Sequence, residues 1–223
     1  MNLLIIGSSS SIANVLIENL KKKKKLKIVT LGRQKLTKKN HYYIKNYNDE
    51  SIIKIFKKIN KKKFKFDSII FFNGYQKFST LSFFDGKLFS KIIKINFLIP
   101  LKILSILLRK NLVNLNSSTL FVSSIAADLN EVGNAYYSLA KSILNKSIKI
   151  LNKEQKNKHR FNILSLGMVN NKMSQKMIKN FPGKFKNINA FIDSKKMIKN
   201  FKKIIFNKNL NNSIIKIHGK YKN

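Results

Sequence analysis

The chain has 223 residues, 43% of them hydrophobic and none of them cysteine, which suits one domain with a sizeable core and excludes disulfide scaffolds and thiolate sites. No apolar stretch is long enough to cross a bilayer and no secretory signal is evident, so we expect a cytoplasmic protein. The formal net charge is +37, but all but three of the cations are lysines. A/T-rich codons explain such a composition, and specific binding to nucleic acid or to anionic lipid is the less favoured alternative.

Short apolar runs, typical of buried strands, alternate along the chain with longer amphipathic stretches, typical of helices. The expected strands lie at residues 3–6, 27–31, 41–44, 68–72, 120–122, 161–164 and 214–217. The expected helices lie at 12–20, 49–59, 85–108, 135–151 and 190–205, and Pro100 should bend or split the third of them. Connections too long for hairpins predict an α/β fold: a doubly wound (Rossmann-type) parallel sheet of about seven strands with helices on both faces, in a single domain over 1–223.

The turn after the first strand is a candidate phosphate site. Gly7 permits a tight turn, and the four serines that follow it are small enough for backbone N–H groups to approach an anion at the helix N-terminus. Ligands of doubly wound sheets bind at this edge, beyond the carboxyl ends of the strands. Because the turn has only one glycine, an ordinary strand-to-helix turn with a serine cap is the favoured explanation when these residues are taken alone.

Arg33 follows the second strand, where the adenosine ribose of a bound dinucleotide would lie. An acidic residue at this place accepts a hydrogen bond from a free 2′-hydroxyl, whereas an arginine pairs with a 2′-phosphate. No Asp or Glu occurs between Lys21 and Asn48. The pattern therefore favours NADP(H) over NAD(H), and a solvated arginine on a lysine-rich surface is the alternative.

A stronger pattern begins at the end of the fifth strand, where Ser124 lies. Tyr137 and Lys141 are four residues apart on the next expected helix, so their side chains share one face. A nearby ammonium lowers the pKa of a phenol, and a phenol tuned in this way exchanges a proton with a carbonyl or alcohol oxygen. Tyr-x-x-x-Lys pairs arise by chance in a lysine-rich chain, but this pair follows a serine at a strand end within a dinucleotide-type fold.

With these motifs the chain resembles the single-domain branch of the short-chain dehydrogenase/reductase family, over nearly its whole length. In this family the catalytic serine precedes the catalytic tyrosine by thirteen residues, which selects Ser124 over Ser123. The Tyr-x-x-x-Lys motif selects Tyr137 over Tyr136. Lys94-Ile95-Asn96 matches the helix asparagine of the family's Asn–Ser–Tyr–Lys tetrad. Phe71-Phe72-Asn73-Gly74 stands at the family's Asn-Asn-Ala-Gly motif, and residues 161–171 match the segment around the sixth strand.

The resemblance implies hydride transfer between a nicotinamide and a small-molecule carbonyl or secondary alcohol. Tyr137 would be the general acid or base, and Lys141 would lower its pKa and hold the nicotinamide ribose. Ser124 would orient the carbonyl, and Asn96 would anchor a water linked to Lys141. The implied cofactor-binding residues are Gly7, Ser9, Ser10, Ser11, Ile12, Arg33, Asn73, Gly74, Tyr137, Lys141, Val169 and Asn171. Homo-oligomers packed through the helices of Asn96 and Tyr137 are implied as well.

The sequence departs from the family pattern mainly at positions of the cofactor-binding motifs. Ser11 and Ala13 replace the second and third glycines of the first turn, Asn73 replaces an alanine, and Asn171 replaces a threonine. Because the tetrad is intact, we interpret the chain as an active enzyme with an altered cofactor pocket. A degenerate, non-catalytic member of the fold that acts as a binding or scaffold protein is the alternative.

Residues 170–189 lie where the family has its substrate-covering segment. An apolar lid there would use Met168, Met173, Met177 and Phe181, although an ordinary amphipathic helix explains the pattern equally well. The segment is basic, which leads to the hypothesis of an anionic substrate such as a nucleotide sugar or a carrier-linked acyl chain. The three histidines have no ligand spacing, so no metal site is expected.

Overall fold

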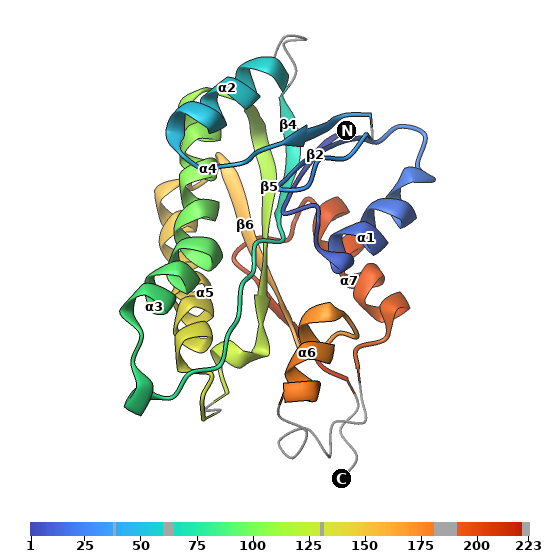
Figure 1. Cartoon of the computed structure of the whole chain (residues 1–223). Helices are drawn as coiled ribbons and strands as arrows, with labels where there is room; N and C mark the ends of the chain where they lie inside the picture. The colour runs from blue at the N-terminus through green and yellow to red at the C-terminus, as the bar shows by residue number, and fades with distance from the viewer. Residues whose placement is uncertain (38, 60–64, 130–131, 181–190, 220–223) are drawn as a thin grey trace.

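The computed structural model describes residues 1–37, 39–59, 65–129, 132–180 and 191–219. Within this part of the chain, seven parallel strands form one sheet in the order β3-β2-β1-β4-β5-β6-β7 (Figure 1). Their bounds are β1 (Asn2–Ile6), β2 (Lys27–Gly32), β3 (His41–Tyr43), β4 (Phe66–Phe71), β5 (Val113–Ser124), β6 (His159–Leu166) and β7 (Ile214–Ile217). The prediction of a doubly wound parallel α/β sheet is confirmed.

Helices cover both faces of the sheet because successive strand side chains point to opposite faces and both sets are apolar. In β1, Leu4 and Ile6 pack into one core cluster, whereas Leu3 and Ile5 pack into the other. The helices α2 (Asp49–Ile59), α4 (Ile99–Arg109) and α5 (Ala135–Glu154) cover the first cluster. The helices α1 (Ser11–Lys21) and α7 (Ser194–Phe206) cover the second (Figure 1).

The strand order reverses between β1 and β4, and this reversal positions the site. The chain runs outward from β1 through β2 to β3, and then returns to place β4 on the other side of β1. The helix that follows β1 therefore leaves over one face, while the helices that follow β4 leave over the opposite face. A crevice opens between such diverging connections at the carboxyl ends of the strands.

The long helix expected over 85–108 is divided, as the prediction for Pro100 allowed. It consists of α3 (Gly86–Ile93), a π-helical turn (Lys94–Leu98) and α4. The break lies one turn before Pro100, because proline has no N–H to donate to the carbonyl of Asn96. The chain widens there, and the N–H of Ile99 bonds to the carbonyl of Lys94, five residues back.

Two other elements differ in extent from the prediction. β5 begins at Val113, not at residue 120. Its early residues include Ser117 and Ser118, which are polar but buried, because β5 lies between β4 and β6 in the sheet. Apolar runs cannot reveal a strand segment of this kind. α7 begins at Ser194, not at residue 190, because the Asp193 carboxylate accepts a hydrogen bond from the N–H of Lys196 and caps the helix.

The remaining short elements lie at or near the carboxyl edge of the sheet. They are the 3₁₀ turns Leu81–Phe83 and Ile125–Ala127 and the helix α6 (Lys172–Asn180). α6 begins the expected lid, whose residues 181–189, including Phe181, lie outside the described residues. Among the helices of the described residues, none combines the length and apolarity that a membrane span requires.

Candidate active site

A pocket of about 640 Å³ lies at the carboxyl ends of the strands, where the strand order reverses. This volume is within the range of cofactor sites. The lining includes every residue predicted for the site except Asn96, namely Gly7, Ser9, Ser10, Ser11, Ile12, Arg33, Asn73, Gly74, Ser124, Tyr137, Lys141, Val169 and Asn171. Lining residues that the sequence reasoning missed include Gln34, Tyr47, Gln76, Leu129 and Asn134.

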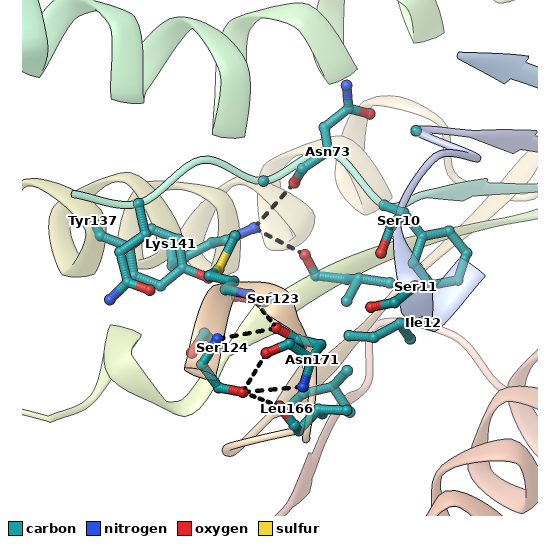
Figure 2. Close-up of a pocket in the computed structure, with 18 of the residues that line it drawn as sticks. Ser10, Ser11, Ile12, Asn73, Ser123, Ser124, Tyr137, Lys141, Leu166 and Asn171 are labelled. Carbon is teal, nitrogen blue, oxygen red and sulfur yellow. Dashed lines mark hydrogen bonds between the residues drawn. The ribbon is translucent and has the colours of Figure 1, made fainter. Parts of the chain in front are cut away.

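Ser124 and Tyr137 meet at one wall of the pocket (Figure 2). Ser124 is the last residue of β5, and its Oγ accepts a hydrogen bond from the N–H of Ala126 at 3.2 Å. The Ser124 hydroxyl also hydrogen-bonds the phenol of Tyr137, which lies in the first turn of α5. Burial raises the pKa of Tyr137 to about 12, and the bond from Ser124 opposes this only in part. Tyr137 therefore keeps its proton at neutral pH.

Lys141 lies one helical turn after Tyr137 and is buried. Its Nζ donates hydrogen bonds to the carbonyls of Val122, at 3.0 Å, and Asn73, at 3.4 Å, as the dashed lines in Figure 2 show. The Nζ is 5.7 Å from the centroid of the Tyr137 ring. Burial lowers the pKa of Lys141 to about 7, so much of its charge is lost near neutral pH.

The pKa of Tyr137 is therefore shifted in the opposite direction from the sequence-based expectation. We expected the ammonium of Lys141 to lower it, but the desolvation of the phenol outweighs other influences. The amine of Lys141 also points to two backbone carbonyls, and its own burial disfavours the charged form. The predicted pair is present, but its electrostatics are dominated by burial.

Asn96 is fully buried and lies beneath the pocket rather than in its wall. Its Nδ2 donates to the carbonyls of Tyr75, at 2.8 Å, and Ile92, at 2.9 Å. The N–H of Tyr75 donates in return to its Oδ1, at 3.4 Å. Asn96 thus ties the π-helical turn to the segment after β4, which carries Asn73 and Gly74 into the pocket.

The first turn has the geometry of an anion cradle. Gly7 has a φ of 79°, and a Cβ placed on it would lie 2.9 Å from the carbonyl carbon of Phe72, so glycine is required here. Ser10 precedes α1 in an extended conformation, and its side chain makes no capping hydrogen bond. The first-turn N–H groups of α1 beside Ser11 and Ile12 are therefore available to an anion at the pocket wall. These residues fit the pyrophosphate of a dinucleotide.

At the far end of the pocket, three connections bring Arg33, Tyr47 and Asn73 together. The ring of Tyr47 packs against the core cluster under α2 and α4. Burial raises the pKa of its hydroxyl, while the Arg33 guanidinium and a hydrogen bond from the Asn73 side chain oppose the shift. Tyr47 closely follows β3, so the rule that ligands bind beyond strand ends is the signal that could have found it.

The segment after β6 supplies the remaining wall. Asn171 lines the pocket, but its Oδ1 caps α6 by accepting from the N–H groups of Met173, at 2.8 Å, and Ser174, at 3.1 Å. The Ser174 hydroxyl donates to the carbonyl of Val169 at 2.6 Å. Three methionines of the expected lid, Met168, Met173 and Met177, line the pocket. The methionine side chains therefore give this wall an apolar and adaptable surface. The hydrogen bonds of Asn171 and Ser174 hold the chain at the start of α6.

The fold and the pocket together define a doubly wound (Rossmann-type) α/β protein with a Ser–Tyr–Lys group in its pocket. Residues 11–203 match a family model described as Enoyl-(Acyl carrier protein) reductase. The match covers most of the chain, and the chain belongs to the short-chain dehydrogenase/reductase family, as an oxidoreductase. A search of curated protein sequences finds no significant match.

Solved structures share the fold at low sequence identity. A short-chain dehydrogenase family protein from Francisella tularensis subsp. tularensis SCHU S4 has a TM-score of 0.84 and 18% identity, over 97% of this chain and 96% of that one. The aldohexose dehydrogenase of Thermoplasma acidophilum has a TM-score of 0.86 and 11% identity, over 97% and 92%. A 4-hydroxyisoleucine dehydrogenase complexed with NADH has a TM-score of 0.78 and 18% identity, over 98% and 96%.

Proposed function

We propose that the protein is an NADP(H)-preferring oxidoreductase that interconverts a carbonyl and a secondary alcohol, with Tyr137 as the general acid or base. One observation carries the proposal: the hydroxyl of Tyr137, hydrogen-bonded to Ser124, lines the same pocket as the N-terminus of α1. A nicotinamide cofactor bound in this pocket would supply or accept the hydride. The chain's own residues supply the proton and the orientation.

The two hydroxyl groups have complementary roles in carbonyl reduction. Tyr137 gives its proton to the substrate oxygen as negative charge develops there, and Ser124 donates a hydrogen bond to the same oxygen. Because burial holds the pKa of Tyr137 at about 12, the hydroxyl is fully protonated at neutral pH, which suits the reductive direction. Lys141, one helical turn away, is the nearby amine that would stabilise the phenolate left behind.

The remaining lining residues would hold the cofactor along the pocket. The N–H groups at the start of α1 would bind the pyrophosphate, and Lys141 and Tyr137 would bind the nicotinamide ribose. Val169 and Asn171 would contact the carboxamide. The NADH complex of the 4-hydroxyisoleucine dehydrogenase supports a nicotinamide cofactor, and Arg33 supports a preference for the 2′-phosphorylated form.

For the substrate, we propose an extended molecule with an apolar part and an anionic group. Met168, Met173 and Met177 offer an apolar wall, and Lys172 lies beside them in the lining. A carrier-linked acyl chain or a sugar derivative has this character. The description of the matching family model supports the first, and the aldohexose dehydrogenase supports the second.

The test is turnover of NADPH with a panel of 3-oxoacyl thioesters, nucleotide sugars and small neutral ketones, comparing Tyr137→Phe with the wild type. We expect the variant to lose about 10²- to 10⁴-fold in turnover because the proton donor is gone. Binding of NADPH, followed by nicotinamide fluorescence, should change by less than about threefold, since the ring remains.

The matched control is Tyr136→Phe. The Tyr136 hydroxyl is also buried on α5, but it accepts a hydrogen bond from the N–H of Asp85 at 2.9 Å and does not line the pocket. This variant should keep most of its turnover. Comparable turnover in Tyr137→Phe and the wild type would contradict the proposed role of Tyr137. A wild-type protein that binds NADPH but reduces no member of the panel would favour the non-catalytic alternative.

A further inference from the structure

The polar group formed by Arg33, Tyr47 and Asn73 takes no part in the proton transfer described above. It lies at the pocket end away from Tyr137, and its members come from the connections after β2, β3 and β4. Figure 2 shows that the Asn73 side chain points away from Lys141, while the Asn73 backbone carbonyl accepts the hydrogen bond from the lysine. Asn73 thus faces both ends of the pocket.

The hydrogen-bonding pattern of this group fixes which atoms can reach a ligand. The Oδ1 of Asn73 is buried and has no hydrogen-bond partner among the described residues. The bond between Asn73 and Tyr47 must therefore use the amide nitrogen, which donates to the hydroxyl oxygen of Tyr47. Since a phenol has one proton and can accept at its oxygen, the O–H of Tyr47 is left to donate elsewhere.

The group therefore presents two kinds of donor side by side. The guanidinium of Arg33 is close enough to Tyr47 to affect its ionisation. Together they offer a charged fork and a neutral O–H to an anion. The Asn73 side chain, whose Oδ1 is buried, holds the Tyr47 hydroxyl in place through its amide nitrogen. A phosphate group on the ribose of a dinucleotide complements such a pair of donors.

We propose that Tyr47 determines specificity for the 2′-phosphorylated ribose of NADP(H) by donating to the phosphate beside Arg33, and that Asn73 is the residue that positions the Tyr47 hydroxyl. This proposal rests on the proposed function. Arg33 is exposed on a surface rich in lysine, so charge alone discriminates poorly among anions. Tyr47 is held by packing against the core, and a partly desolvated donor in a fixed position discriminates better.

The test is binding, measured by calorimetry with 2′,5′-ADP and 5′-AMP and by nicotinamide fluorescence with NADPH and NADH. Tyr47→Phe keeps the ring that packs on the core. It should weaken the binding of 2′,5′-ADP and NADPH by about tenfold, which is the loss expected when a hydrogen bond to a charged group is removed. Its affinity for 5′-AMP and NADH should stay within about twofold of the wild type, because both ligands lack the 2′-phosphate.

Tyr43→Phe is the matched control, because Tyr43 is an exposed tyrosine on β3 that does not line the pocket. It should leave all four affinities unchanged. Asn73→Ala, which installs the residue typical of the family, should weaken the binding of NADPH by up to about tenfold and leave that of NADH within about twofold, since it removes the amide that positions the Tyr47 hydroxyl. Thermal melting of each variant verifies that it is folded.

Two results would overturn the inference, and they are distinguishable. If Arg33→Ala weakens NADPH but Tyr47→Phe leaves it unchanged, or weakens NADPH and NADH equally, Tyr47 has no specificity role while the proposed function stands. If the wild-type protein binds 2′,5′-ADP no more tightly than 5′-AMP, the NADP(H) preference fails together with this inference.

Discussion

The two ends of the pocket are built in different ways. The proposed catalytic end depends on particular side chains, because proton transfer there would require the hydroxyl of Tyr137 and a partner such as Ser124, to which it is hydrogen-bonded. The nucleotide end depends largely on backbone geometry, because the N–H groups at the start of α1 are present whatever side chains the turn carries. The comparison explains how the family's tetrad can be intact while two glycines of the first turn are replaced.

The catalytic end should also carry a cost in stability that the nucleotide end lacks. Lys141 has a pKa of about 7 in the folded chain against an ordinary value of 10.5. The unfolded chain therefore binds more protons at this residue between these values. The destabilisation is fully present below pH 7 and is relieved as the pH rises.

The largest expected effect on stability comes from Lys141→Met, which replaces the buried amine with an apolar group of similar length. We expect the variant to exceed the wild type in free energy of unfolding at pH 6. This advantage should shrink by up to about 1.4 kcal/mol per pH unit between pH 7 and 9. Denaturant unfolding at each pH measures both quantities.

Lys146→Met is the control for this comparison, because Lys146 is exposed on the same helix. Its difference from the wild type should be small and independent of pH. A Lys141→Met variant whose advantage over the wild type does not change between pH 6 and 9 would show that burial does not shift the pKa of Lys141.

At the nucleotide end, Gly7 should be sensitive to substitution. Gly7→Ala forces a side chain into a positive φ and against the carbonyl carbon of Phe72. We expect a loss of about 1–3 kcal/mol in the free energy of unfolding, together with weaker NADPH binding. Gly86→Ala is the matched control, since a Cβ there lies at an ordinary 3.6 Å from the Phe84 ring and the residue begins α3. A Gly7→Ala variant as stable as Gly86→Ala would contradict the account of the turn.

The smallest effect should come from Ser11→Gly, which restores a glycine typical of the family. Ser11 is exposed and starts α1, and we attribute its contribution to the anion cradle to its backbone N–H. NADPH affinity should change by less than about threefold in fluorescence titration. A gain of about tenfold or more would mean that the serine side chain obstructs the pyrophosphate.

Most of the fold and the core of the site could be predicted from the sequence because their signals are local. Apolar runs located β1 and β4, and the four-residue spacing placed Tyr137 and Lys141 on one helix face. The polar first half of β5 was missed, since its burial depends on neighbouring strands. Tyr47 was missed for a related reason, because its contact with Asn73 joins residues distant in the sequence.

The central claim is that this pocket binds a nicotinamide dinucleotide with a preference for the 2′-phosphate. The most direct test is nicotinamide fluorescence during titration with NADPH and with NADH at moderate salt, with Arg33→Ala and the exposed control Arg109→Ala alongside. The account predicts saturable binding of both, tighter for NADPH, with a loss of about tenfold for NADPH in Arg33→Ala alone. Absence of saturable binding of either cofactor to the folded wild-type protein would contradict it.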